Sequence, residues 1–273
     1  MNGTPSFSLD KKVIIVTGAT GVLGEAFVES IAASGGRVVL IGRNTQTGEE
    51  RAARIREKGG EAFFAAADVL DKEALINIRE EVLAKWGSID GLVNAAGGNL
   101  PEAVIGPDAD IFDINIDGLK KAFDLNLFGT LLPVSVFGPA LQQSGNGSIV
   151  NISSMAAQTA ITRVLGYSMA KAAIDNYTRF MCVETAKRYG TRLRVNAIAP
   201  GFFITHQNRA LLTNPDGSYT ARGEAVIRNT PFNRFGAPEE LNGALIWLLS
   251  DASSFVSGEV ICIDGGFHIY SGV

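Results

Sequence analysis

Short apolar runs alternate along the chain with longer segments in which apolar residues recur at helical spacing. The runs hold few polar positions, which is typical of strands that are buried on both faces of a sheet. We predict strands at Val13–Val16, Arg37–Ile41, Ala62–Ala66, Gly91–Asn94, Ser148–Ile152, Arg194–Ile198 and Val260–Ile263. Strands that alternate with helices form a parallel sheet, so the pattern predicts an α/β fold with a doubly wound sheet of about seven strands.

The chain of 273 residues contains no Pro/Gly/Ser-rich linker, internal repeat or low-complexity tract. We therefore predict a single domain, 1–273. From about 202 to 235 the pattern becomes irregular, with Asn214-Pro215-Asp216-Gly217 as a strong turn. Long excursions in compact α/β domains are usually lids or binding loops, so we predict a lid at 202–235.

Composition narrows the class of protein. Hydrophobic residues make up 46% and charged residues 19%, which suits a compact core, and a net charge of −4 without a basic stripe disfavours a nucleic-acid partner. The N-terminus lacks a signal-peptide pattern, and no run of about 18 apolar residues occurs, which disfavours secretion and membrane insertion. Cys182 and Cys262 are expected to be reduced, buried thiols in a cytoplasmic protein.

Candidate chemistry is concentrated in Tyr167-Ser168-Met169-Ala170-Lys171 and in Ser154, which lies upstream. A phenol has a pKa of about 10 and exchanges protons poorly at neutrality unless its anion is stabilised. On a helix, Lys171 lies one turn from Tyr167 and can lower the pKa of the phenol, while a serine hydroxyl can polarise a carbonyl. Alone, Tyr and Lys at this spacing are more often an amphipathic surface pair. The catalytic interpretation therefore depends on the combination of this pair with Ser154 and the glycine-rich turn and on their order along the chain.

The segment Thr17–Gly24, T-G-A-T-G-V-L-G, follows the first predicted strand and opens a helix. In this context a glycine turn places a pyrophosphate against helix N–H groups. Asp68-Val69 follows the third strand, where the carboxylate can meet an adenine ring, and Asn94–Gly97 follows the fourth. Taken in isolation, a helix N-cap and a tight turn would be the better interpretations of these two segments.

The end of the second strand, Ile41-Gly42-Arg43-Asn44, carries no acid to bind the 2′-hydroxyl of NAD, whereas Arg43 can pair with a 2′-phosphate. The alternative is a solvated arginine. We therefore expect NADP as the cofactor, with NAD as the alternative.

These motifs, in this order, resemble the short-chain dehydrogenases/reductases of the single-domain type over essentially the whole chain. Asn126 in D-L-N-L-F-G, Pro200-Gly201 with Thr205, and a near-terminal I-D-G-G extend the match. The resemblance implies a Rossmann-type fold with catalytic Asn126, Ser154, Tyr167 and Lys171. Tyr167 would be the acid/base, Lys171 would hold the ribose, Ser154 would orient the carbonyl and Asn126 would support a proton-relay water. Asn126 can equally be a buried side chain that ties up helix backbone.

The residues that the motifs and the resemblance assign to the dinucleotide are Gly18, Thr20, Gly21, Val22, Leu23, Arg43, Asp68, Val69, Asn94, Ala95, Ala96, Tyr167, Lys171, Pro200, Gly201 and Thr205. Two of them depart from the family pattern. Val22 stands where the family usually has its middle glycine, and Ala95 replaces the second asparagine of N-N-A-G. The pyrophosphate path can therefore differ from that of the family.

Several stretches resemble the fructuronate reductase (D-mannonate oxidoreductase) group of this family: the segment after A-A-G-G-N-L-P, the loop P-G-F-F-I-T-H-Q-N-R-A-L-L, P-F-N-R-F-G and the terminal Y-S-G-V. Gln158, Arg163, His206 and Arg209 are the candidate substrate residues, because guanidinium and amide groups suit a polyhydroxylated carboxylate. A solvated helix face is an equal alternative for His206 and Arg209. Two histidines without ligand spacing indicate no metal site.

Three rival functions stay open: a 3-oxoacyl-carrier-protein reductase, which a polar lid disfavours, a gluconate or polyol dehydrogenase, and a nucleotide-binding regulatory module without catalysis. Turnover of a carbonyl with NADPH would exclude the last. The resemblance implies a homotetramer, and the apolar tail Phe267–Tyr270 favours an interface, although it can also pack on its own domain. A small carbonyl or alcohol is the expected partner.

Overall fold

The computed structural model describes residues 6–205 and 208–272 of the chain. Seven parallel strands form one sheet in the order β3-β2-β1-β4-β5-β6-β7. The strands are β1 (Val13–Thr17), β2 (Arg37–Gly42), β3 (Ala62–Ala66), β4 (Gly91–Asn94), β5 (Gly147–Ile152), β6 (Leu193–Pro200) and β7 (Val260–Ile263). All seven predicted strands are confirmed, with ends shifted by no more than two residues, and the α/β class is confirmed with them.

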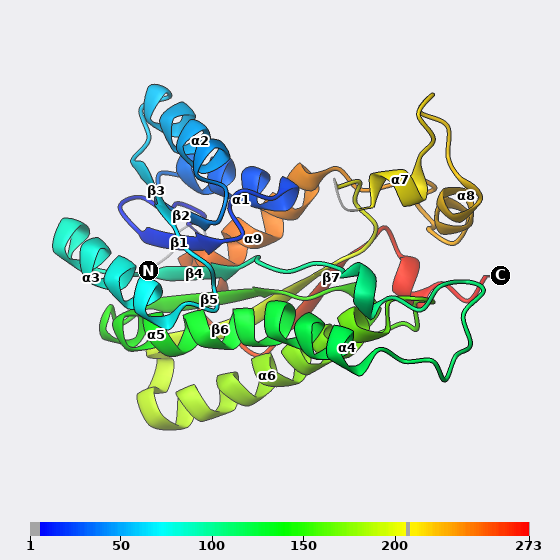
Figure 1. Cartoon of the computed structure of the whole chain (residues 1–273). Coiled ribbons are helices and arrows are strands. Elements are labelled where there is room, and N and C mark those ends of the chain that lie inside the picture. Colours follow the sequence, from blue (N-terminus) through cyan, green and yellow to red (C-terminus); the bar gives the residue numbers. More distant parts are fainter. Residues whose placement is uncertain (1–5, 206–207, 273) are drawn as a thin grey trace.

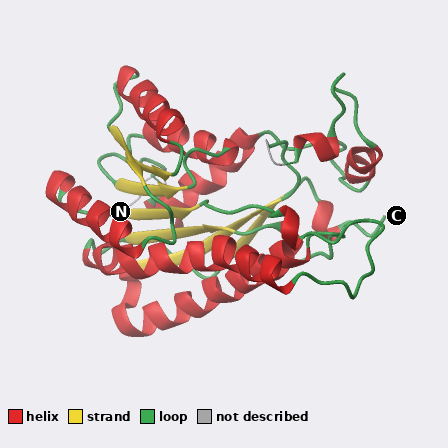
Figure 2. Ribbon diagram, in the orientation of Figure 1, coloured by secondary structure: helices red, strands yellow, loops and turns green. Residues whose placement is uncertain are grey.

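Helices cover both faces of this sheet (Figure 1; Figure 2). They are α1 (Val22–Ala33), α2 (Thr45–Glu57), α3 (Lys72–Trp86), α4 (Ile116–Phe123), α5 (Gly129–Gln143), α6 (Leu165–Tyr189), α7 (Arg209–Leu212), α8 (Ala221–Arg228) and α9 (Asn242–Leu249). One apolar core lies between the sheet and α1, α2 and α9, and a second lies between the opposite face and α3, α5 and α6. Because both faces are covered, the strands are mostly apolar on both faces.

Polar residues at the helix starts explain where several crossover helices begin. The side chains of Asn44, Asp71, Asn115 and Thr220 each accept a hydrogen bond from the backbone N–H three residues further on. Such N-caps satisfy donors that have no partner inside the helix. The loops before α2, α3, α4 and α8 therefore have defined ends.

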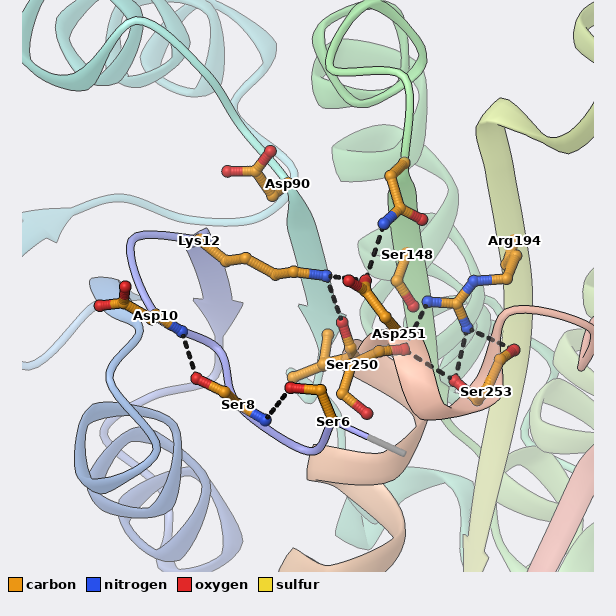
Figure 3. A network of polar contacts seen from close by, with 12 residues as sticks. Ser6, Ser8, Asp10, Lys12, Asp90, Ser148, Arg194, Ser250, Asp251 and Ser253 are labelled. Carbon is orange, nitrogen blue, oxygen red and sulfur yellow. Dashed lines mark hydrogen bonds and ion pairs between the residues drawn. The ribbon is translucent and has the colours of Figure 1, made fainter. Parts of the chain in front are cut away.

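A polar network holds α9 against the amino-terminal ends of the strands (Figure 3). Arg194, near the start of β6, is buried and donates to the carbonyls of Leu248 and Ser250 and to the hydroxyl of Ser253. These acceptors lie at and just beyond the end of α9, where helix carbonyls have no partner inside the helix. The network therefore lies at the opposite edge of the sheet from the carboxyl ends of the strands.

Cys182 and Cys262 are free, but both are half-buried, so the expectation of buried thiols is wrong.

Within the described residues, the continuous helical stretch Ile116–Gln143 is long and apolar enough to cross a membrane, but half of its most apolar window is buried inside the fold. Its second part is α5, which packs on the sheet as a core helix.

Candidate active site

A cavity of about 350 Å³ opens at the carboxyl ends of β1, β4, β5 and β6. Its wall is built from the glycine-rich turn after β1, the loops after β4 and β5, the start of α6, the segment after β6 and the lid. The order of the strands reverses between β1 and β4, and ligands of open α/β sheets bind in the crevice at such a point. The cavity is therefore the candidate active site.

Ser154, Tyr167 and Lys171 all line this cavity. Ser154 lies two residues beyond the end of β5, and α6 carries Tyr167 and Lys171 one turn apart. The Lys171 ammonium nitrogen lies 5.5 Å from the centre of the Tyr167 ring, and a side-chain hydrogen bond joins Ser154 to Tyr167. Groups that can bind, polarise and protonate a carbonyl oxygen thus meet at one place.

Lys171 is a buried cation held by neighbouring polar groups. Its Nζ donates to the backbone carbonyl of Ile152 at 2.7 Å. Burial lowers the pKa of Lys171 to about 8, and the charge of Asp175, one turn further along α6, opposes that lowering. Asp175 in turn accepts a hydrogen bond from the hydroxyl of Ser153. The ammonium therefore loses its proton well below the pH at which a free lysine would lose it.

The pKa of Tyr167 departs from the sequence expectation, in which Lys171 lowers it. Burial raises the pKa of Tyr167 above the ordinary value, and the hydrogen bond with Ser154 offsets only part of that rise. Burial depends on tertiary packing, which the spacing of Tyr and Lys does not contain. The hydroxyl is therefore protonated near neutral pH, which is the form that can donate a proton.

Asn126 lies in η2 (Asp124–Phe128), a π-helical turn between α4 and α5. Such turns are frequent at functional sites. Asn126 is fully buried; its Oδ1 accepts from the N–H of Gly98 at 2.9 Å, and its Nδ2 donates to the carbonyls of Gly98 and Ala122. The side chain thus ties the loop after β4 to the helix. Its role with a relay water stays a prediction, since the side chain does not line the cavity.

The glycine-rich turn packs directly against the loop after β4, where a bulky side chain has no room. Gly18 adopts φ +65°, and a Cβ there would lie 2.6 Å from the carbonyl oxygen of Ala95. The buried hydroxyl of Thr17 accepts from the N–H groups of Ala95 and Ala96 and so joins the two loops. A backbone cradle at a helix N-terminus fits the pyrophosphate of a dinucleotide. Val22 lines the cavity in place of the missing glycine.

Arg51 of α2 holds this turn from beneath. Its guanidinium is buried and donates to the carbonyls of Ala19 at 2.5 Å and Gly21 at 2.8 Å, and it pairs with Glu25 at 2.8 Å. Burial lowers the pKa of Arg51, and the Glu25 charge opposes this. Sequence reasoning missed this residue, because an arginine inside a polar helix has no distinguishing spacing.

The expected adenosine end lies outside the cavity, on the surface. Arg43 and Asp68 form a loose ion pair at 3.8 Å, with 77% and 45% of the side chains exposed, respectively. Asp68 also accepts from the N–H of Leu70, while Val69 is buried. Of the residues assigned to the dinucleotide, those that do not line the cavity are Thr20, Arg43, Asp68, Val69, Asn94 and Ala96. An exposed guanidinium beside an acid is available to an incoming phosphate.

Asn94 has a buried side chain whose Nδ2 donates to Asn151, while its Oδ1 has no hydrogen-bond partner among the described residues. Pro200, Gly201 and Thr205 line the cavity beside Ser154 and Tyr167. With the cradle at Gly18, these positions form a continuous path from the glycine-rich turn to the tyrosine. The residues present therefore fit a dinucleotide.

The candidate substrate residues are not brought together. Gln158, Arg163 and Arg209 are exposed and do not line the cavity, and His206 lies outside the described residues. Gln158 instead accepts from the Cys262 thiol at 3.3 Å. Their substrate roles stay predictions without support from the cavity wall.

Arg222 of α8 and Asn99 line the cavity, and sequence reasoning missed both of these polar residues. An eight-residue helix with several charges does not reveal from its spacing which side chain faces inward.

Much of the remaining wall near the lid is apolar, including Phe202, Leu211 and others. Among the described residues of the wall, Lys171 and Arg222 are cations and none is Asp or Glu, so the cavity favours an anion. In the same described ranges, no group of three or more His, Cys, Asp or Glu residues could hold a metal ion.

Known proteins share this sequence and structure. A family model described as enoyl-(acyl carrier protein) reductase matches residues 18–268. The oxidoreductase UxuB of Bacillus subtilis (strain 168), whose activity is uncharacterised, is 42% identical over 97% of this chain and 98% of its own. The crystal structure of a candidate D-mannonate oxidoreductase from Haemophilus influenza with bound NAD is 39% identical, with a TM-score of 0.90 over 97% of this chain and 98% of the other. A gluconate 5-dehydrogenase from Burkholderia cenocepacia J2315 in complex with NADP and tartrate is 31% identical, with a TM-score of 0.84 over 96% of each chain.

Proposed function

This chain belongs to the short-chain dehydrogenase/reductase family and is an NAD(P)-dependent oxidoreductase acting on CH–OH groups, and on that premise we propose that it interconverts D-fructuronate and D-mannonate. The observation that carries the proposal is the charge of the cavity, whose described wall holds two cations, Lys171 and Arg222, and no acid. A substrate with a carboxylate balances such a wall. The likeness to a candidate D-mannonate oxidoreductase over nearly the whole chain supports the sugar acid.

The proposed chemistry distributes the proton transfer over the described side chains. When bound, the dinucleotide supplies a hydride to the carbonyl carbon in reduction and accepts one in oxidation. In reduction, the Ser154 hydroxyl donates a hydrogen bond to the carbonyl oxygen, and the Tyr167 hydroxyl gives that oxygen its proton. The Lys171 ammonium then stabilises the phenolate by its charge. Ketone, hydride and proton thus give a secondary alcohol, and the tyrosine must be reprotonated for the next turnover.

We propose NADP(H) as the preferred cofactor and NAD(H) as the alternative. Arg43 is exposed at the end of β2, where a 2′-phosphate would be expected, and Asp68 holds it only loosely. A guanidinium there can form charged hydrogen bonds with that phosphate. The related structures carry either cofactor, NAD in one and NADP in the other.

Two other substrate classes have support of their own. A gluconate or polyol dehydrogenase would use the same groups on a different sugar, and a gluconate 5-dehydrogenase shares the fold. A 3-oxoacyl-carrier-protein reductase is favoured by the apolar wall at Phe202, Leu211 and Leu212. The same apolar residues oppose the expectation that a polar lid excludes an acyl chain.

The test is the rate of NADPH and NADH oxidation with D-fructuronate, 5-ketogluconate, D-fructose and acetoacetyl thioesters as substrates. The proposal expects the highest kcat/KM for D-fructuronate, and higher with NADPH than with NADH. A preference for acetoacetyl thioesters would contradict the sugar-acid proposal, and a preference for the neutral ketose would contradict the role of the cavity charge.

A further inference from the structure

The lid contributes one cation to the cavity, and its surroundings differ from those of the other arginines near it. Arg222 is the second residue of α8 and is half-buried, and it lines the same cavity as Ser154 and Tyr167. Arg163 and Arg209 are exposed and lie outside the wall. Of these three guanidinium groups, only that of Arg222 shares a space with the reacting groups.

The contacts of Arg222 leave its charge without a counterion. Its Nη1 and Nη2 donate to the hydroxyl and carbonyl of Thr162 at 3.4 and 3.3 Å, both long and between a cation and neutral groups. Within residues 6–205 and 208–272 it forms no ion pair, whereas Arg234 is held by Glu240 at 2.6 Å. Burial lowers the pKa of Arg222, and the neighbouring Arg163 charge adds to that lowering. A half-buried cation next to a like charge is stabilised by an anion that enters the cavity.

We propose that Arg222 binds the carboxylate of the substrate and thereby determines which carbonyl carbon reaches Ser154 and Tyr167. This inference rests on the proposed function, because it assigns the anionic end of the sugar acid to one side chain. A guanidinium can donate hydrogen bonds to both carboxylate oxygens in one plane, which fixes the orientation of the acid as well as its position. Among its described residues, the wall holds no acid side chain that would compete for the guanidinium.

The position of Arg222 also connects substrate binding with the lid. The residue belongs to α8, while Thr162 belongs to the loop that leads into α6 and its Tyr167. The two long hydrogen bonds already bridge the lid and this loop. A carboxylate bound by Arg222 therefore lies between the lid and the catalytic helix, and holds the two together over the reacting groups.

Arg222→Met tests the assignment, because methionine keeps the length of the side chain and removes the charge. Arg228→Met is the matched control, since Arg228 is an exposed residue of the same helix that does not line the cavity. Steady-state kinetics with D-fructuronate and with D-fructose, its neutral counterpart, measure the effect on the acid alone. Arg222→Lys separates the charge from the planar fork.

We expect Arg222→Met to lower kcat/KM for D-fructuronate by about 10- to 150-fold, the range of a lost charged hydrogen bond pair, and to leave D-fructose unchanged. Arg222→Lys should show an intermediate loss for the acid, and Arg228→Met none. The dissociation constant of NADPH should stay the same in all variants. Equal losses for acid and neutral sugar, or the same loss in Arg228→Met, would overturn the assignment.

Binding of D-mannonate and D-gluconate, measured by calorimetry in the presence of NADPH, distinguishes this inference from the proposed function. If wild type binds these acids and Arg222→Met does not, the carboxylate site stands even where D-fructuronate is not reduced, and the proposed function fails alone. If D-fructuronate is reduced and Arg222→Met binds and reduces it normally, the inference fails alone. If wild type binds and reduces no sugar acid, both are overturned.

Discussion

Arg51→Met isolates the guanidinium that holds the glycine-rich turn. The substitution removes the donor to Ala19, Gly21 and Glu25 while it keeps an extended apolar side chain in the same buried space. The three acceptors that lose the Arg51 guanidinium are not affected equally. The carbonyl of Gly21 still accepts from the N–H of Glu25 at 3.0 Å, and Glu25 still pairs with Arg54 at 2.5 Å.

The carbonyl of Ala19 is the group left without a donor, in a residue with no exposed surface. A buried polar group that loses its partner costs about 1–3 kcal/mol, so the free energy of unfolding should fall by about that amount. If about 1.4 kcal/mol of this is lost in the ordering of the turn, the dissociation constant of the dinucleotide rises about tenfold. We therefore expect a higher KM for the dinucleotide with little change in kcat.

Urea denaturation gives the stability and fluorescence titration with NADPH gives the dissociation constant. Arg54→Met is the matched control, because Arg54 contacts the same Glu25 but neither carbonyl of the turn. Wild-type affinity in Arg51→Met would refute the reasoning. Equal weakening in Arg54→Met would also refute it, because the effect would then come from the ion pair and not from the turn.

Three further predictions concern the lysine, the cofactor and the oligomer. Because burial lowers the pKa of Lys171 to about 8, its ammonium is charged below that pH and neutral above it. The NADPH dissociation constant of wild type should therefore be constant below this pH and rise above it. Fluorescence titrations of Lys171→Ala should show weaker NADPH binding that does not change across this pH. Arg43→Ala should raise the KM for NADPH about tenfold and leave the KM for NADH unchanged, and a wild type that already favours NADH in kcat/KM would contradict this. The chain should sediment as a tetramer at micromolar concentration, in keeping with the exposed side chain of Ile269, and a monomer would disprove it.

The sheet could be predicted from the sequence because its strands are mostly apolar on both faces and alternate with segments in which apolar residues recur at helical spacing. The ends are less certain for a physical reason. β6 extends to Pro200, two residues beyond the predicted end, because its final residues pair with β7. Strand pairing between distant segments determines such ends, and a local pattern does not contain it.

The candidate site could be predicted where residue type and spacing together limit the chemistry. Ser154, Tyr167 and Lys171 meet in the cavity because a strand end and one helix turn bring them there. The raised pKa of Tyr167 and the inward position of Arg222 depend on packing between distant segments, and the local pattern carries no signal for either. Arg163 and Arg209 were predicted to contact the substrate because of their positions in the sequence, but both side chains are exposed on the surface.

The assignment of Tyr167 as the proton donor is tested by Tyr167→Phe, which removes the transferable proton and little else. The matched control is Tyr177→Phe, since Tyr177 lies on the same helix, outside the cavity, and packs against the core. The measurement is the rate of NADPH oxidation with D-fructuronate, together with the NADPH dissociation constant by fluorescence. We expect Tyr167→Phe to lose about 10²- to 10⁴-fold in kcat and to bind NADPH like wild type, and we expect Tyr177→Phe to keep its kcat. A Tyr167→Phe variant that keeps most of its kcat would contradict the assignment of the proton donor.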